Sequence, residues 1–139
     1  MKRLAIFALC LFMGAGVCVA QDTMGSDAAL LFQYYRFNAM YFFGELPVEN
    51  ITIIWDKVIS KSEMAGTWIT HYEGEPEKIK IGISLYAQDC ETCVSMAILH
   101  QMVHIKLRDW NLKTNDMHGD TFQKEMLKLA QQGAFALYW

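Results

Sequence analysis

The first stretch with a regular apolar pattern runs from about Ala28 to Phe43 and predicts a helix. Leucines and aromatic residues fill most of it, but polar residues interrupt them too often for a segment that lies in lipid. Ser26 or Asp27 can cap the first turn, and Gly44 and Pro47 end the pattern. The pattern therefore indicates an aromatic helix that is buried against a sheet.

Three shorter stretches have the composition and spacing of β-strands, namely Ile51–Trp55, Gly66–Tyr72 and Lys78–Leu85. In the last of them, isoleucines alternate with polar or small residues, as in a strand with one buried face. The acidic segment 73–77 contains a glycine and a proline and predicts a turn that joins the second and third strands as a hairpin. A small antiparallel or mixed sheet follows from this pattern.

Helical spacing returns from Thr92 to about Asp109. On a helical wheel, apolar residues cover two flanks of this segment, and His100 and His104 share a third sector. We therefore expect a helix that is enclosed on most sides. A buried pair of histidines on such a helix needs polar partners, because burial of an unpaired polar group is costly.

A last helix is predicted from Asp120 to about Gln132, since Asp120 and Gln123 resemble a capping box. The chain contains no internal repeat and no low-complexity tract. The order of the elements predicts one α+β domain with an N-terminal helix, a three-stranded sheet, a central histidine-bearing helix and a C-terminal helix.

The first twenty residues have the organisation of a removable export signal. Lys2 and Arg3 precede the apolar run Leu4–Phe12, and small residues lead to a predicted cleavage after Ala20. The run is too short to span a bilayer, so we expect no stable membrane anchor. We expect residues 1–20 to be a signal peptide and residues 21–139 to form a single exported domain, periplasmic or secreted.

Charge argues against nucleic acid as a partner. The chain has 12 Lys and Arg against 15 Asp and Glu, and removal of Lys2 and Arg3 makes the balance more acidic. The basic residues are scattered and form no stripe interleaved with aromatic residues, which a nucleic-acid-binding surface would require.

Three of the four histidines are candidate metal ligands. His100 and His104 are one helical turn apart and can reach the same cation, and His118 stands just before a helix start, where its side chain can turn back. This spacing suits zinc. In the H-E-x-x-H pattern of zinc peptidases, the glutamate after the first histidine takes a proton from the attacking water. Gln101 holds that place here, and a neutral amide is not a useful base.

These histidines and the order of elements resemble the SprT-like family of zinc metallopeptidase domains. The resemblance extends from about Leu31 to Gln132 and includes an H-G-x-x-F segment that begins at His118. It implies a zincin-type fold in which His100, His104 and His118 bind one zinc ion with water as the fourth ligand. It also implies a polypeptide substrate and a last helix that Phe122 packs under the metal site.

The family's catalytic glutamate maps onto Gln101, which leaves the ligands intact and removes the base. Three origins stay open: an engineered substitution, a natural change in a pseudoenzyme, or a natural change compensated by Asp116 or Asp120, which flank His118. Turn formation and helix capping are the simpler roles for these two aspartates. Two functions follow, a silenced zinc metallopeptidase domain or a non-catalytic zinc-binding module that holds a protein or peptide partner.

Cys90 and Cys93 remain after removal of the signal, directly before the central helix. An oxidising compartment favours a disulfide between them. They are too far from the histidines to share the metal, because Cys93 precedes His100 by about 10 Å along a helix. A thiol redox protein that uses this pair is a third hypothesis. His71 has no partner in the sequence and is expected to be an ordinary strand residue.

Overall fold

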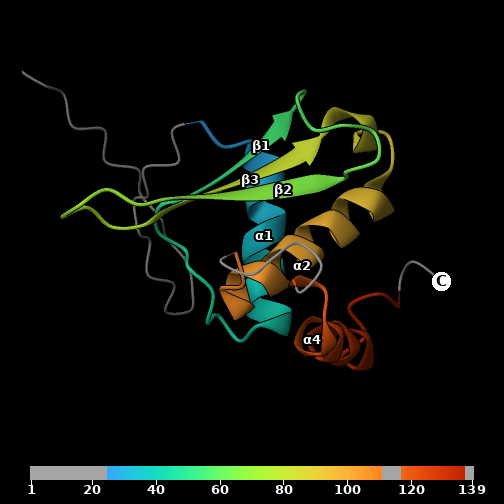
Figure 1. Ribbon diagram of the computed structural model, residues 1–139. Helices are drawn as coiled ribbons and strands as arrows, with labels where there is room; N and C mark the ends of the chain where they lie inside the picture. The colour runs from blue at the N-terminus through green and yellow to red at the C-terminus, as the bar shows by residue number, and fades with distance from the viewer. Residues whose placement is uncertain (1–24, 111–116, 137–139) are drawn as a thin grey trace, which may run out of the picture.

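The computed structural model describes residues 25–110 and 117–136. Its elements follow the predicted order, with the histidine-bearing helix α2 between the sheet and the last helix (Figure 1). Their bounds are Ala28–Tyr41 for α1, Ile51–Asp56 for β1, Ala65–Thr70 for β2, Lys78–Ser84 for β3, Leu85–Ala87 for the short 3-10 helix η1, Glu91–Leu107 for α2 and Asp120–Gln131 for α4. The α+β class is confirmed. The predicted signal peptide, residues 1–20, lies outside the described residues.

The sheet is mixed and has the strand order β1-β3-β2. The predicted hairpin is confirmed, since β2 pairs antiparallel with β3, whereas β1 pairs parallel with β3. Strand β3 is central, with a paired strand on each side, and its isoleucines are buried. Its position makes β2 an edge strand.

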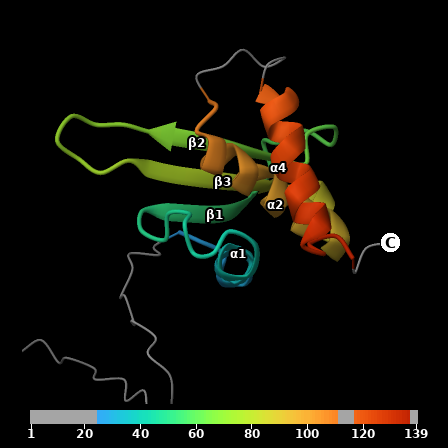
Figure 2. The same cartoon turned by 90° about the horizontal axis from the view of Figure 1, so that it is seen from below.

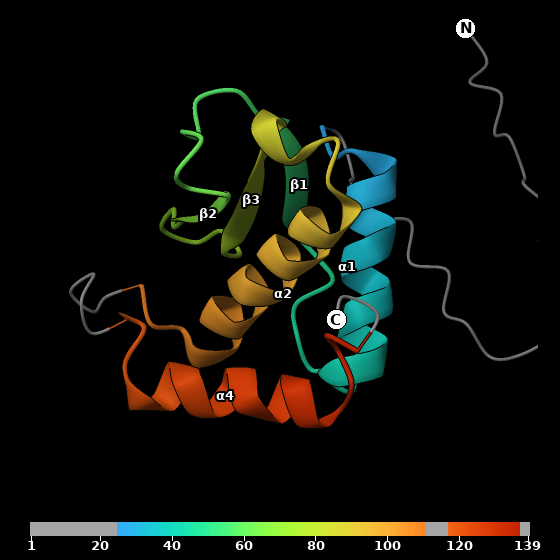
Figure 3. The same ribbon diagram turned by 90° about the vertical axis from the view of Figure 1, so that its right-hand side faces the viewer.

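The core lies between one face of the sheet and the helices α1 and α2. Figure 3 shows α2 running diagonally across the sheet with α1 beside it, and Figure 2 shows α1 nearly end-on next to β1. Each fully buried aliphatic side chain contributes roughly 1.5–3 kcal/mol to stability relative to exposure. The most completely buried apolar residues are Tyr34, Ile53, Ile81, Ile83, Ile98, Leu99, Met102 and Val103. Four of them belong to α2, so the prediction of an enclosed central helix is confirmed.

Two glycines on the other face of the sheet make room for an indole ring. Gly66 and Gly82 are cross-strand partners. A β-carbon built on Gly82 would lie 2.8 Å from the ring of Trp68 and 2.9 Å from Ile59. Any larger residue at this position therefore forces the indole away from the sheet.

The start of α1 distinguishes between the two candidate capping residues. Asp27 caps the helix, because its carboxylate accepts hydrogen bonds from the backbone N–H groups of Ala29 and Leu30, each at 3.0 Å. Ser26 instead accepts a hydrogen bond from the backbone N–H of Ile53 in β1. Asp27 therefore stabilises the start of the helix, and Ser26 connects that start to β1.

Helix α1 ends at Tyr41, two residues before the predicted end at Phe43. Phe43 and Gly44 both have positive φ, which no α-helix can continue. The buried side chain of Asn38 holds the following turn. Its Nδ2 donates to the carbonyl of Leu46, and its Oδ1 accepts from the backbone N–H of Leu46.

The predicted capping box at Asp120 is wrong. Gly119 is the N-cap of α4 and Asp120 is already the first helical residue. Gln123 therefore lies one position too late to close such a box, and its side-chain amide donates to the carbonyl of His118 at 3.3 Å instead. None of the described helices is long and apolar enough to cross a lipid bilayer.

Candidate metal centre

The middle of α2 carries two histidines on one face. His100 and His104 are separated by one helical turn, and their Nε2 atoms lie 3.1 Å apart. Apolar packing of the other faces of α2 against the sheet and α1 fixes the direction in which these two rings point.

The third histidine comes from the chain just before α4. The Nε2 atom of His118 lies 3.0 Å from that of His100 and 3.2 Å from that of His104. Phe122, in the first turn of α4, contacts all three imidazoles with ring centroids 4.6–4.8 Å apart. The last helix therefore packs under the histidine cluster, as the resemblance implied.

The three histidines can hold one metal ion. In a tetrahedral site with Zn–N bonds of about 2.0–2.1 Å, ligand nitrogens are roughly 3.3–3.4 Å apart. The observed separations of 3.0–3.2 Å come close to that spacing. Burial, followed by the neighbouring His104 and His118, lowers the pKa of His100 from 6.5 to about 4, so this ring is neutral at pH 7. A neutral imidazole offers a lone pair to a metal.

Asp109 orients one of these ligands, and sequence reasoning missed it. Both of its carboxylate oxygens lie 2.9–3.0 Å from Nδ1 of His104. Both side chains are buried, with exposed fractions of 4% and 8%. The carboxylate places the ring proton on Nδ1, so Nε2 of His104 presents its lone pair to the centre of the cluster.

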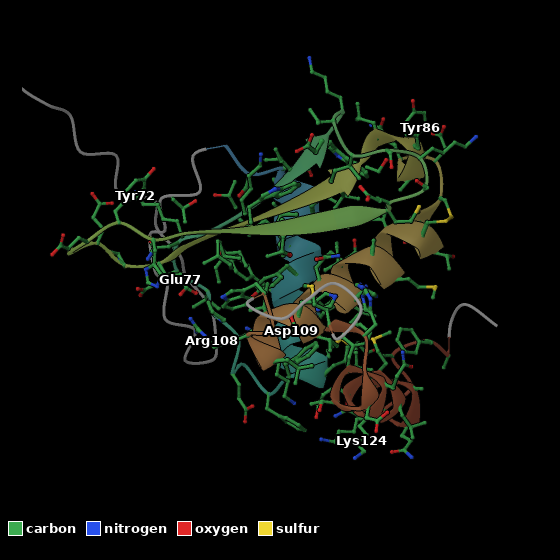
Figure 4. All side chains as sticks on the ribbon, viewed as in Figure 1. Tyr72, Glu77, Tyr86, Arg108, Asp109 and Lys124 are labelled. Carbon is green, nitrogen blue, oxygen red and sulfur yellow. A yellow bond between two sulfur atoms is a disulfide. The ribbon has the colours of Figure 1, made fainter. Side chains whose placement is uncertain are left out.

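Asp109 follows the C-terminal end of α2. Arg108 adopts a left-handed conformation (φ 52°, ψ 41°) that ends the helix. Its guanidinium donates to both carboxylate oxygens of Glu77 in the β2–β3 connection, at 2.6 and 2.8 Å (Figure 4). His71 is an exposed partner of the same Glu77 at 3.5 Å and is not part of the histidine cluster. The left-handed conformation of Arg108 is a property of the backbone, so no pattern in the sequence points to Asp109.

Comparison with known protein families gives one match. The sequence model of the SprT-like family matches residues 31–136. This chain belongs to the SprT-like family. Comparison with curated proteins and with solved structures gives no match. The SprT-like region includes all three histidines, Gln101 and Asp109, so the candidate metal centre lies within the part of the chain that matches the family.

Gln101 is buried beside the histidines of this SprT-like domain, with an exposed fraction of 7%. Its Oε1 accepts a hydrogen bond from Oγ1 of Thr67 in β2 at 2.9 Å. A hydroxyl donor suits an amide oxygen and a carboxylate oxygen equally well. Strand β2 therefore holds the side chain of Gln101 in place beside the histidines.

A cleft of about 630 Å³ opens next to the histidine cluster. His100, Gln101 and His118 line it, together with residues from the approach to β2, from the first half of α2 and from α4. Its lining includes one carboxylate, that of the exposed Glu63. Asp120, one of the two aspartates considered as a substitute base, lines a separate small pocket beside Asp109. The other, Asp116, lies outside the described residues.

A disulfide joins Cys90 and Cys93 at the start of α2, as expected. Cys90 is the N-cap residue, and its sulfur accepts a hydrogen bond from the backbone N–H of Cys93 at 3.2 Å. Cys93 lines the cleft, whereas neither cysteine belongs to the group that can hold a metal. The disulfide therefore fixes the first turn of the helix that carries the ligands.

Proposed function

We propose that this SprT-like domain binds one zinc ion through His100, His104 and His118, and that it is an exported metallopeptidase domain whose hydrolytic step is silenced by Gln101. The observation that supports this proposal most directly is the convergence of three Nε2 atoms at 3.0–3.2 Å. Three neutral imidazoles with an open position are a common ligand set of catalytic zinc sites.

Each part of the site has a role in this proposal. Asp109 holds His104 in the tautomer that can bind a cation. The cleft receives an extended polypeptide, and the edge strand β2 offers backbone groups that can pair with it. A zinc ion held by the histidines would supply a Lewis acid that polarises a peptide carbonyl and lowers the pKa of a water molecule.

Gln101 removes the base that this chemistry needs. A glutamate at this position would accept a proton from the attacking water, whereas the amide of Gln101 has no useful basicity. General-base catalysis typically contributes about 10²–10⁴ in rate, which corresponds to roughly 3–5 kcal/mol in the barrier. The domain as it stands should therefore bind polypeptide and cleave it very slowly.

Restoring the carboxylate tests the proposal. Gln101→Glu keeps the hydrogen bond from Thr67 and supplies the missing base. The zinc-loaded variant should cut a panel of denatured proteins about 10²–10⁴ times faster than the parent chain. The matched control is Gln101→Glu combined with His118→Gln, which keeps the base and lacks one ligand, and should be inactive. A zinc-loaded Gln101→Glu variant that leaves every denatured protein intact would refute the peptidase assignment.

The second candidate function is a non-catalytic zinc-binding module that holds a protein or peptide partner. The place of Gln101 in the lining of the cleft favours it, because an amide can both donate to and accept from a bound backbone. The two candidates differ in the Gln101→Glu experiment, since a binding module gains no cleavage. They also differ in the genomic codon for position 101, which reads glutamate only if the glutamine was engineered.

The predicted export signal and the acidic charge balance support a setting outside the cytoplasm for this function. We place the domain in the periplasm or outside the cell, with polypeptide rather than nucleic acid as its partner. Mass spectrometry of the exported protein should give a chain that begins at Gln21. A full-length chain that stays in the cytoplasm would contradict this location.

A further inference from the structure

The cleft beside the histidines has an apolar wall made by three methionines. Met64 precedes β2, Met96 lies in the second turn of α2, and Met126 lies in the middle of α4. Elements far apart in the sequence thus bring the same residue type to one cavity. Ala65 and Ala97 also line the cleft, and their short side chains leave room in it.

These methionines are only partly covered by the protein. Met96 is 38% exposed, and Met64 and Met126 are half-buried at the edge of the core. Apolar surface that remains in contact with water favours an apolar ligand, because its burial releases that water. Methionine is unbranched and polarizable, so a wall of methionines can adapt to side chains of different shapes.

The same cleft is lined by polar groups of the histidine cluster. His100, Gln101 and His118 line it, and a peptide bond would be held against them. A side chain next to that peptide bond would share the cavity with the methionines. The volume of about 630 Å³ lies in the usual range of ligand pockets, about 300–1,000 Å³, and accommodates a large side chain together with its backbone.

Glu63 gives the cleft a negative charge. It lines the cavity and is exposed, so it repels an acidic side chain that approaches the methionine wall. The lining contains no lysine or arginine among the described residues that could offset this repulsion. The charge therefore acts against acidic segments and leaves apolar ones unaffected.

We infer that the methionine wall, formed by Met64, Met96 and Met126, is a side-chain pocket that selects polypeptide segments with a large apolar residue next to the metal-bound position. This inference rests on the proposed function, since it names the class of polypeptide that the same site takes. Segments of this kind are exposed in unfolded chains and buried in folded ones. The pocket therefore directs the domain toward unfolded polypeptide.

The parent chain is suited to the test, because Gln101 slows cleavage while binding is measured. Fluorescein-labelled heptapeptides of glycine and serine carry leucine, methionine, phenylalanine, alanine or aspartate at the centre, and fluorescence anisotropy gives their affinity for the zinc-loaded protein. We expect the leucine, methionine and phenylalanine peptides to bind at least tenfold more tightly than the alanine peptide, because burial of each methylene contributes about fourfold in affinity. The aspartate peptide should bind most weakly.

Two methionine variants test whether the methionine wall causes the preference for large apolar side chains. Met96→Gln should weaken the leucine peptide several-fold and reduce the difference between leucine and alanine. Met40→Gln is the matched control, since Met40 is 55% exposed on α1 and does not line the cleft, and it should change neither value. Equal binding of all five peptides, or equal effects of the two variants, would overturn the pocket.

Zinc content separates this failure from failure of the proposed function. If the protein holds one equivalent of zinc and does not discriminate among the peptides, the metal site stands and the pocket is refuted. If the protein holds no zinc and the leucine peptide still binds selectively through Met96, the pocket stands and the proposed function fails. Absence of both zinc and selective peptide binding refutes both.

Discussion

Replacing Asp109 with alanine removes the group that orients His104. The carboxylate lies 2.9–3.0 Å from Nδ1 of His104, and both side chains are buried. Alanine leaves the Nδ1–H without its acceptor in a site that excludes most water. It also frees the imidazole to change its tautomer, which would put a proton on the nitrogen that faces the metal.

The size of the effect follows from the burial of this pair. A buried donor that loses its partner costs about 1–3 kcal/mol, which corresponds to a factor of roughly 5 to 150 in an equilibrium constant. Loss of a residue that supports a metal-binding histidine typically weakens metal affinity about 10- to 100-fold. We therefore expect the zinc Kd of Asp109→Ala to rise roughly 10- to 100-fold. Asp109→Asn keeps an acceptor for Nδ1–H and should show a smaller rise.

Competition with a chromophoric chelator at pH 7.5 measures the zinc Kd of each variant, and circular dichroism shows whether it is folded. Asp56→Ala is the matched control, because Asp56 is also largely buried and paired, with Lys80 at 3.6 Å, but lies in β1 outside the metal centre. Its zinc Kd should equal that of the parent chain. A folded Asp109→Ala variant with an unchanged zinc Kd would refute the idea that Asp109 prepares His104 for metal.

The remaining predictions concern stability and redox chemistry. The metal-free protein should lose stability as the pH falls from 6.5 to about 4, because the unfolded chain then binds a proton that buried His100 excludes. Urea unfolding of a His100→Gln variant should lack this part of the pH dependence. Asn38→Ala leaves two buried backbone groups of Leu46 unpaired and should lower the free energy of unfolding by about 2–4 kcal/mol, whereas a change below 0.5 kcal/mol would contradict the role of this turn. Gly82→Ala should lower the melting temperature and red-shift tryptophan emission as the indole is displaced, and unchanged emission would count against the packing. The Cys93→Ser variant and the parent chain should both reduce a model disulfide at the background rate. A lower rate for the variant than for the parent chain would indicate a redox function.

Much of the fold was predictable because its signals are local. The alternating isoleucines of β3 and the apolar flanks of α2 identify a strand and an enclosed helix without knowledge of any neighbour. The turn between β2 and β3 is equally local. The parallel pairing of β1 with β3 was not predictable, because β1 has no connection to β3 short enough to fix its direction.

The candidate metal centre was predictable for similar reasons. The spacing of His100 and His104 within one helix predicts them as ligands, and the place of His118 before the last helix predicts it as the third. Asp109 and Glu63 were not predictable from the sequence. The role of Asp109 depends on the left-handed conformation of Arg108, and that of Glu63 on the path of the chain before β2. The capping residue of α4 also required the backbone, since Gly119 and Asp120 are adjacent and only the dihedral angles distinguish them.

The zinc content of the protein, purified without added metal, tests the central claim most directly. Elemental analysis should find one equivalent of zinc per chain, and less than a tenth of that in a folded His118→Gln variant. His71→Gln, which alters the one described histidine outside the cluster, should keep the full equivalent. Two results would contradict a metal site built from His100, His104 and His118. One is a parent chain without zinc, and the other is a His118→Gln variant that keeps one equivalent.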